Sequence, residues 1–319
     1  MNIIYTVCNR SSLPHALALG ASVMEHQPGD IFYIGWVDNR PVPHLPEQYR
    51  IIPVTDLAIP LWQQMTEQYY DFELLPACRP WFAKKIMELN PHCNRLTFFA
   101  PTVLLLNSVE SVIGRQAEMT LTPHITSPLR KSAPLEDKRI LNIGMFHAGS
   151  WSIRKSTQTL DFLNWWAVRT LDRAKYDLCD GMCLDQLWLN FGPVRIHNWE
   201  KVSEPSWHYG LHRLPNHPLE AANGQFSVGG NTLLSVDFAG LLFFDPIWSD
   251  YAGMARRSIA FQELVSYYRT LLAAAGPEAT PKGTPGYGQI PEIKAGRILR
   301  NKLAAKLSDI TEFIDQYQI

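Results

Sequence analysis

Two stretches of the sequence carry side chains whose types and spacing could do chemistry. Asp185 and Gln186 are adjacent, and an acidic acceptor beside an amide that both donates and accepts can bracket two neighbouring hydroxyl groups. The stretch WHYGLHRL brings His208 and His212 together, and His147 lies upstream; a histidine can hold or release a proton near neutral pH. These residues predict a site for a polar ligand. The plainer alternative for Asp185 is a stabilising charge at a helix N-terminus.

Several familiar catalytic and phosphate-binding patterns are absent from the sequence. No Gly-x-Gly-x-x-Gly follows a strand, and no Gly-Lys-Ser/Thr loop, Gly-x-Ser-x-Gly turn or His-Glu-x-x-His helix occurs. The late segment GTPGYG lacks a following Lys-Ser, so its glycines are predicted to serve flexibility. Hydrolase and zincin functions therefore have no support.

The composition is that of a globular protein without a strong charge. Of 319 residues, 46% are apolar and 18% charged, and the net charge of -1 gives no pull toward nucleic acid. Ten tryptophans and twelve tyrosines fit a large core better than sugar-binding platforms, although both uses are known. Five scattered cysteines predict a reduced, cytoplasmic protein, and Cys179 with Cys183 lacks a second ligand pair for zinc. We expect neither a signal peptide nor a membrane span.

Strands and helices alternate along the first part of the chain, which predicts a mainly parallel sheet flanked by helices, an α/β fold. The predicted strands are 2–7, 31–37, 50–53, 96–99, 103–106, 119–122 and 142–153. The predicted helices are 13–26, 61–70, 80–89, 157–174, 181–190, 257–274 and 292–317.

One predicted strand is interrupted in its middle. In NRLTFFAPTVLLLN, the apolar runs 96–99 and 103–106 flank Ala100, Pro101 and Thr102. Proline cannot donate to a sheet ladder, so the strand must end or bulge there. Ligands of parallel sheets bind outside the carboxyl ends of the strands. The interruption is therefore predicted to face the pocket.

The domain organisation is predicted as a main domain of residues 1–255 and a helical extension of residues 256–319. A Gly/Pro-rich linker at 276–291 precedes the last helix, whose apolar stripe alternates with charged positions. This helix either packs back on the domain, as we expect, or presents a basic first half to a membrane or a partner.

Three blocks, in order, resemble bacterial glycosyltransferases of the GT-A type that are related to the glycogenin-like and galactosyltransferase-like families. The blocks are FELLPACRPWFAKKIME (72–88), NIGMFHAGSWSIRKSTQTLDFLNWWAVR (142–169) and GMCLDQLWLN (181–190). The resemblance covers roughly residues 2–246. It implies the GT-A nucleotide-diphospho-sugar transferase fold, a mainly parallel mixed sheet flanked by helices.

The resemblance also implies roles for individual residues. Those matching the nucleotide and donor-binding positions are Thr6, Cys8, Asn9, Asp38, Arg79, Ala148 and Gly149. Asp185 and Gln186 match the pair near the reacting centre, with His147 beneath the donor sugar where relatives carry asparagine. Trp207, His208 and His212 match a segment beside the acceptor.

The departures from the family concern its metal. Relatives end the interrupted strand in Asp-x-Asp, whose carboxylates hold Mn²⁺ or Mg²⁺ against the donor diphosphate, whereas this chain has Ala100 and Thr102. Asp237 replaces a ligating histidine, while Gly240 is retained. A carboxylate is a poor diphosphate partner, because two like charges 4 Å apart cost about 4 kcal/mol at an effective dielectric near 20. We therefore predict donor binding without a metal or other cofactor.

Without that metal, the leaving diphosphate needs fixed cations. The candidates are Arg79, Lys84, Lys85, Arg154, Lys155 and Arg213, together with His208 and His212. For any single lysine or arginine, a solvated surface charge is the plainer explanation.

The expected activity is hexosyl transfer from a nucleotide-diphosphate sugar, with a UDP-sugar favoured, to a glycan, a lipid-linked sugar or a protein. Retention of anomeric configuration and a place at the inner face of the membrane are weaker expectations. One alternative is a catalytically degenerate relative that binds a nucleotide sugar or a partner. A nucleotidyltransferase is a weaker one, because the Gly-rich, Lys-containing N-terminal loop is absent.

Overall fold

A computed structural model describes residues 1–42, 45–129, 137–222, 224–274 and 283–290, together with residues 303, 307 and 310. The chain divides into two compact units, Met1–Gln289 and Ile290–Ile319. Helix α8 belongs to the first unit, where it packs on α1. The predicted division after residue 255 stays a prediction.

The first unit is built on a seven-stranded sheet of order β10-β6-β7-β4-β1-β2-β3. Strand β7 runs antiparallel to both of its neighbours, and the other neighbouring pairs are parallel. The predicted α/β architecture, a mainly parallel mixed sheet flanked by helices, is confirmed. The strands are β1 (Asn2–Cys8), β2 (Ile31–Trp36), β3 (Tyr49–Pro53), β4 (Arg95–Phe99), β6 (Met119–Pro123), β7 (Phe146–Arg154) and β10 (Trp199–Lys201).

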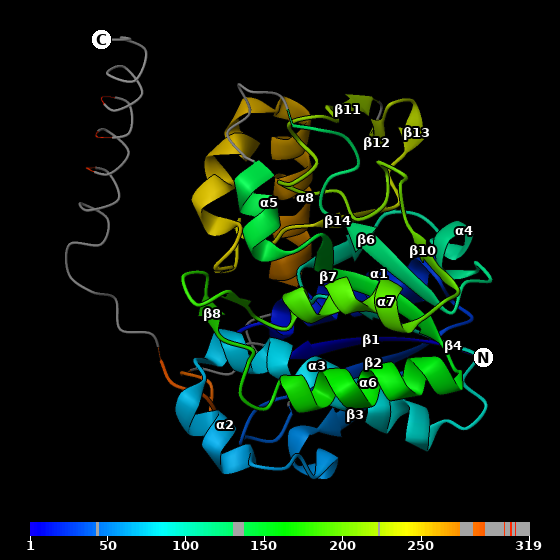
Figure 1. The fold of residues 1–319 in the computed structure, drawn as a ribbon. Helices are drawn as coiled ribbons and strands as arrows, with labels where there is room; N and C mark the ends of the chain where they lie inside the picture. The colour runs from blue at the N-terminus through cyan, green and yellow to red at the C-terminus, as the bar shows by residue number, and fades with distance from the viewer. Residues whose placement is uncertain are drawn as a thin grey trace. The chain divides into compact units, whose positions relative to one another are not determined.

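Helices cover both faces of this sheet. Phe32 and Gly35 of β2 lie an odd number of residues apart and so point to opposite faces. Phe32 packs against Gly20 of α1, and Gly35 receives Phe82 of α3. Figure 1 shows α3 and α6 lying together below β1. The helices are α1 (Leu13–His26), α2 (Trp62–Gln68), α3 (Asp71–Leu89), α4 (Glu110–Ile113), α5 (Asp137–Ile143), α6 (Thr157–Arg169), α7 (Gly192–Arg195) and α8 (Ile259–Ala274), with 3-10 turns η1 (Val54–Leu57), η2 (Gln186–Phe191) and η3 (Ser249–Arg257).

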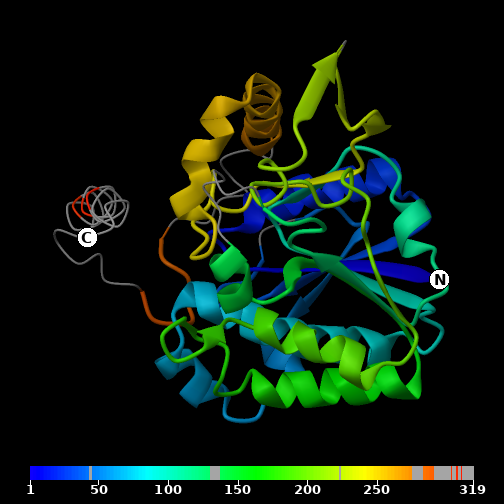
Figure 2. The same ribbon diagram turned by 45° about the horizontal axis from the view of Figure 1, so that its top comes forward.

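The smaller sheets gather residues from late in the chain. Strands β11 (Leu219–Ala222), β12 (Gln225–Val228) and β13 (Asn231–Thr232) form an antiparallel sheet beside α8 (Figure 2). Strands β8 (Tyr176–Asp177) and β9 (Met182–Cys183) form a short hairpin. The helix predicted at 181–190 is wrong, because this segment first pairs with β8 and then forms the 3-10 turn η2.

The interrupted strand marks a change of sheet. Strand β4 belongs to the main sheet, and after Pro101 the chain continues as β5 (Val103–Leu105), which pairs antiparallel with β14 (Ser235–Asp237). The Ala100 amide still donates to the Gly149 carbonyl, 2.8 Å away. Proline therefore stands at the point where the chain leaves the ladder, as its missing N–H requires.

Strand β7 carries part of the site because of its direction. It pairs antiparallel with β4, and Phe99 lies opposite Ser150. The first residues of β7 therefore lie at the edge where β1, β2 and β4 end. The strand predicted from Asn142 begins at Phe146, because Asn142 and Ile143 belong to α5.

Part of the late glycine-rich segment packs against the first part of the chain, and the flexibility predicted for it stays a prediction. Gln289 exchanges main-chain hydrogen bonds with Tyr69 and Asp71, and Tyr287 packs edge-on against Trp62. Gly286 lies so close to Asn39 that a side chain would collide with it. Gly286 and Gly288 therefore permit a close approach between segments.

Replacing Gly288 with alanine should detach this segment. Gly288 has φ +84°, and an added Cβ would lie 2.8 Å from the Asp71 backbone. A left-handed residue with a Cβ costs about 1–2 kcal/mol, so we expect the Asp71 and Gln289 amides to exchange roughly tenfold faster in a hydrogen-exchange experiment. Gly29→Ala is the control, since no atom lies within 4 Å of its added Cβ. Unchanged exchange in the Gly288 variant would contradict the packing.

In the second unit, Leu303, Leu307 and Ile310 have helical backbone and exposed side chains. The rest of the predicted helix 292–317 lies outside the described residues. None of the helices in the described part of the chain combines the length and hydropathy that crossing a membrane requires.

Candidate functional site

A pocket of about 80 Å³ opens at the edge of the sheet where the parallel strands end. The loop from Phe243 to Trp248 forms one of its walls. Ligand sites in proteins usually span about 300–1,000 Å³, so a donor-sized molecule enters only if a wall moves. The predicted site residues that line this pocket are Arg79, Ala100, Thr102, His147, Ala148, Gly149, Asp185, Gln186 and Asp237.

A buried ion pair joins Arg79 and Asp185 across this pocket. The Arg79 Nη1 atom donates to Asp185 Oδ1 at 3.0 Å, and its guanidinium lies 4.9 Å from the centre of the Phe98 ring. Burial raises the pKa of Asp185 to about 6, although Arg79 opposes this effect. Leu184, the preceding residue, has φ +53°, a strained backbone of the kind that gathers at functional sites.

The Gln186 side chain holds the loop at the start of β7. Its Oε1 accepts from the Ala148 amide at 3.0 Å, and its Nε2 donates to the Ile143 carbonyl at 2.8 Å. Both ends of the amide are thus used within the protein. The predicted Asp-Gln pair lines the pocket, and each member already has protein partners.

The shelf at Ala100–Thr102 does not fit the metal of the resembling family. Ala100 and Pro101 offer no side-chain donor, and Thr102 Oγ1 donates to Asp237 Oδ1 at 2.6 Å. Asp237 Oδ1 also accepts from the Ala239 amide at 2.9 Å. Mg²⁺ and Mn²⁺ prefer several oxygen ligands, and this shelf supplies none that is free.

Four buried histidines lie together, and one of them, His147, lines the pocket. The His147 ring lies 4.4 Å from that of His208, 4.9 Å from that of His212 and 4.8 Å from that of His124. Burial, reinforced by the neighbouring histidines, holds the pKa of His147 far below its usual value, and burial lowers that of His124 to about 3. The imidazoles of His147 and His124 are therefore neutral near pH 7.

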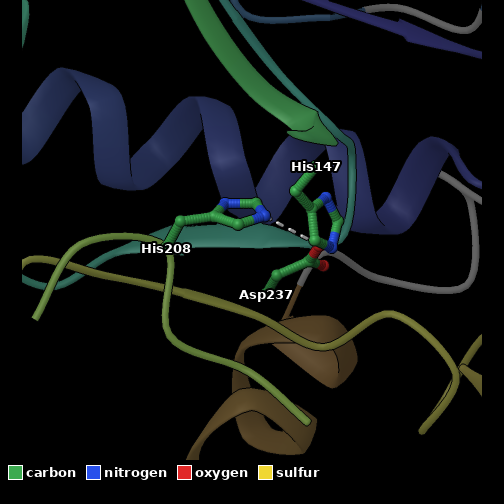
Figure 3. A group of neighbouring side chains, drawn as sticks. All are labelled: His147, His208 and Asp237. Carbon is green, nitrogen blue, oxygen red and sulfur yellow. Dashed lines mark ion pairs between the residues drawn. The ribbon is translucent and has the colours of Figure 1, made fainter. Parts of the chain in front are cut away.

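Asp237 faces two of these rings, as Figure 3 shows. Its Oδ2 lies 3.4 Å from His208 Nε2 and 3.8 Å from His147 Nε2. Burial alone would raise the pKa of Asp237, but His208 and the hydrogen bonds from Thr102 and the Ala239 amide hold it below its usual value. A buried carboxylate that lines the pocket therefore lies among imidazoles.

The residues predicted to hold the nucleotide lie beside the pocket, not among those lining it. Thr6, Cys8 and Asn9 are buried, and the Asn9 side chain accepts from the Ser11 and Ser12 amides that lead into α1. Asp38 forms a buried ion pair with Arg10, whose Nε lies 2.7 Å from Asp38 Oδ2. Although burial opposes it, the bonding to Arg10 holds the pKa of Asp38 below its usual value.

Three other predicted site residues are packed within the protein and do not line the pocket. Trp207 is 2% exposed, and its indole donates to Thr122. Gly240 has φ +79° and lies against the Trp248 backbone. His212 lies within the histidine cluster and does not line the pocket.

Most of the candidate cations lie away from the pocket. Arg154 bonds to Gln116, and Lys155 bonds to the Met87 and Pro91 carbonyls. Because β7 runs antiparallel, its end lies at the opposite edge of the sheet. Lys84 lies over the Trp81 ring.

The sequence placed Arg10 at the site end of the sheet and His124 in a family-like stretch but gave neither a role, and it missed Asp245. Burial raises the pKa of Asp245 to about 6, against hydrogen bonds from the Trp248 and Ile247 amides. His124 ends the stretch LTPH, which also resembles the glycosyltransferase relatives. No pattern along the chain marks Asp245.

No protein-family model matches this chain, and no curated protein does. Solved structures do show similarity. The galactosyltransferase LgtC in complex with donor and acceptor sugar analogues is 11% identical, with a TM-score of 0.45 over 81% of this chain and 96% of that one. An active-site Gln-to-Glu variant of LgtC is 11% identical, with a TM-score of 0.44 over 80% and 95%. A glycosyltransferase involved in the glycosylation of the major capsid of PBCV-1 is 9% identical, with a TM-score of 0.46 over 80% and 100%. Similarity at this level carries no argument about function, which must come from the site.

Proposed function

We propose that this chain is a glycosyltransferase that moves a sugar from a nucleotide-diphosphate donor. The observation that carries the proposal is that residues from separate parts of the sequence meet at one pocket. The three resembling blocks are separate in the sequence, yet Arg79, the segment 147–149 and the pair 185–186 line one pocket. The pocket lies at the edge where open α/β sheets bind ligands.

Arg79 and Asp185 would be the central pair of the reaction. Glycosyl transfer releases a diphosphate, whose developing charge must be stabilised, and Arg79 is a cation fixed at the pocket. Asp185 faces the same space with a pKa near neutrality, which suits a group that contacts sugar hydroxyls or exchanges a proton. Because the two side chains are paired with each other, a bound donor would have to displace Arg79 from Asp185 in order to contact either of them.

The finer parts of the proposal follow from the family resemblance. The donor is a UDP-sugar in the first instance, the sugar is a hexose, and transfer proceeds with retention. The acceptor is a glycan, a lipid-linked sugar or a protein at the cytoplasmic face of a membrane. The shelf at Ala100–Thr102 would receive the diphosphate without Mg²⁺ or Mn²⁺, because it offers no free carboxylate.

A second candidate is a degenerate relative that binds a nucleotide sugar or a partner without turnover. The small volume of the pocket favours this candidate. So do the hydrogen bonds that already occupy the Asp185 and Gln186 side chains within the protein. This candidate predicts ligand-induced stabilisation without any product.

Thermal unfolding in the presence of nucleotide sugars tests the proposal first. A panel of UDP-, GDP-, CMP- and dTDP-sugars is compared in EDTA and in Mn²⁺, and one nucleotide is expected to raise the melting temperature equally in both. Stabilisation grows with the ratio of ligand concentration to Kd. No shift with any donor would contradict a donor site, and a shift that requires Mn²⁺ would contradict metal-independent binding.

Asp185→Asn should abolish transfer while leaving nucleotide binding in place. The substitution removes the charge but keeps an acceptor for Arg79, so we expect turnover to fall at least ~100-fold with an unchanged thermal shift. Turnover is measured as release of the nucleoside diphosphate. Asp161→Asn, an exposed position on α6, is the control. Full activity in the Asp185 variant would remove Asp185 from the reaction.

A further inference from the structure

Two side chains that line the pocket, His147 and Asp237, form with His208 a group that has the composition of a metal site. His147 is the second residue of β7, His208 lies in the loop before β14, and Asp237 ends β14. One potential ligand atom from each lies within 4.8 Å of the others, and all three side chains are buried. Among the described residues, no second group of three or more histidine, cysteine or acidic side chains brings its ligand atoms this close together.

Several polar atoms in and beside this group lack hydrogen-bond partners. Asp237 Oδ2, both ring nitrogens of His208 and the Nε2 of the adjacent His212 are buried without one. Nearly all buried polar side-chain atoms in proteins are hydrogen-bonded. Several neighbouring atoms without a hydrogen-bond partner therefore indicate a missing ligand or ion. A buried carboxylate oxygen beside imidazole nitrogens calls for a cation.

The distances are close to those of a coordinated ion. Asp237 Oδ2 lies 3.4 Å from His208 Nε2 and 3.8 Å from His147 Nε2. Ligands of a tetrahedral zinc with bonds of ~2.0–2.1 Å lie about 3.3 Å apart. Small side-chain movements would therefore bring the three atoms into contact with one ion.

We propose that His147, His208 and Asp237 bind a divalent transition-metal ion of the zinc type. Two imidazoles and a carboxylate suit zinc and the neighbouring transition metals, whereas Mg²⁺ and Ca²⁺ prefer oxygen ligands. This ligand set shares one position with the metal site of the resembling family, that of Asp237, and uses nothing from the Asp-x-Asp shelf. Ala100 and Pro101 contribute no ligand there, and Thr102 is bonded to Asp237.

Bound there, the ion would tie three distant segments together and neutralise Asp237. His208 has φ +47°, an uncommon backbone for a histidine, and a bound ion would offset the cost of holding it. His147 and Asp237 line the pocket, so a fourth coordination position can face it. Sites with three protein ligands keep such a position for water or a ligand oxygen.

The three ligands should contribute unequally. The Gly149 amide donates to His147 Nδ1 at 2.9 Å, which leaves the proton of the neutral ring on Nε2. Metal binding through Nε2 would move that proton to Nδ1 and break this bond. His208 has no such competing partner in the described part of the chain. We therefore expect a larger loss of affinity from His208→Ala than from His147→Ala.

Equilibrium dialysis of the full chain, freed of any affinity tag, tests the site. The chain is stripped with chelator and dialysed against Zn²⁺ and, separately, against Mg²⁺. We expect one equivalent of Zn²⁺ and no Mg²⁺ at the same concentration. Asp237→Ala and His208→Ala should each weaken zinc binding at least ~100-fold, and His147→Ala ~10-fold. His197→Ala, at an exposed histidine, should bind like the unmodified chain.

Co²⁺ substitution gives a second measurement that does not depend on folded variants. A buried two-histidine, one-carboxylate site should give intense visible bands without sulfur-to-metal charge transfer, and the exposed Cys179 should not matter. Substoichiometric zinc, equal binding in the Asp237 and His208 variants, or a weak octahedral cobalt spectrum would each overturn the proposal. No sugar donor is used, so failure here would leave the proposed transfer reaction untouched.

Discussion

Arg79→Met is expected to lower the free energy of unfolding by about 3–5 kcal/mol near pH 8, because it leaves a buried carboxylate without its partner. The Asp185 side chain is fully buried and that of Arg79 is 14% exposed, so solvent screens the pair little. Methionine keeps most of the packing on Phe98. The measurement is urea unfolding followed by tryptophan fluorescence.

The loss should be smaller at pH 5. The pKa of Asp185 is about 6 in the folded chain, above its unfolded value, so the folded state takes up a proton as the pH falls below 6. A raised pKa favours the folded state at low pH and loses that advantage as the pH rises. Removing Arg79 raises this pKa further, and the variant therefore loses more stability than the wild type between pH 5 and pH 8.

Two further variants separate charge from packing. Adding Asp185→Asn to Arg79→Met removes the unpaired charge and should restore most of the lost stability. Arg169→Met, which removes a guanidinium lying over Trp165, should change stability little. A double variant as unstable as Arg79→Met alone would show that packing, and not charge, is responsible.

Gly240→Ala should be nearly as damaging, at about 3 kcal/mol. The added Cβ would lie 2.5 Å from the Trp248 carbonyl carbon and 2.7 Å from the Ser249 nitrogen, and φ is +79°. The left-handed backbone costs about 1–2 kcal/mol and overpacking about 1–3 kcal/mol. Because Trp248 lines the pocket, any ligand affinity should fall as well.

The control is Gly253→Ala in η3. No atom lies within 4 Å of its added Cβ, and its backbone is not left-handed. Its urea midpoint should stay close to that of the wild type. If the Gly240 variant has the same urea midpoint, the 243–248 loop moves away from the added Cβ at little cost in stability. The role of Gly240 would then need another explanation.

Local patterns predicted most of the elements. The helix predicted at 13–26 is α1 to the residue, and the interruption at Pro101 was placed correctly. Helix α3 begins at Asp71, well before the predicted start at Pro80. It contains Pro76 and Pro80 within its length, and these prolines misled the prediction. A proline normally marks a first helical turn, so the pattern favoured a later start.

The site could be predicted only in part. The rule that ligands bind where parallel strands end placed the interruption at the pocket edge. The direction of β7, which brings His147 and Gly149 there, depends on its pairing with β4 and leaves no mark in the sequence. The same holds for the pairing of Arg79 with Asp185 and for the meeting of His147, His208 and Asp237. Their separations in the chain follow no local period.

The pairing of β5 with β14 has a consequence for how the chain folds. It brings Thr102 to Asp237 across 135 residues, and the pocket draws its walls from segments on both sides of that closure. Closing so long a loop is entropically costly and slow, while helices and neighbouring strands form early. During refolding, helical circular dichroism should therefore recover before the pocket exists, and any ligand of the pocket would bind only to chains that have completed this last step.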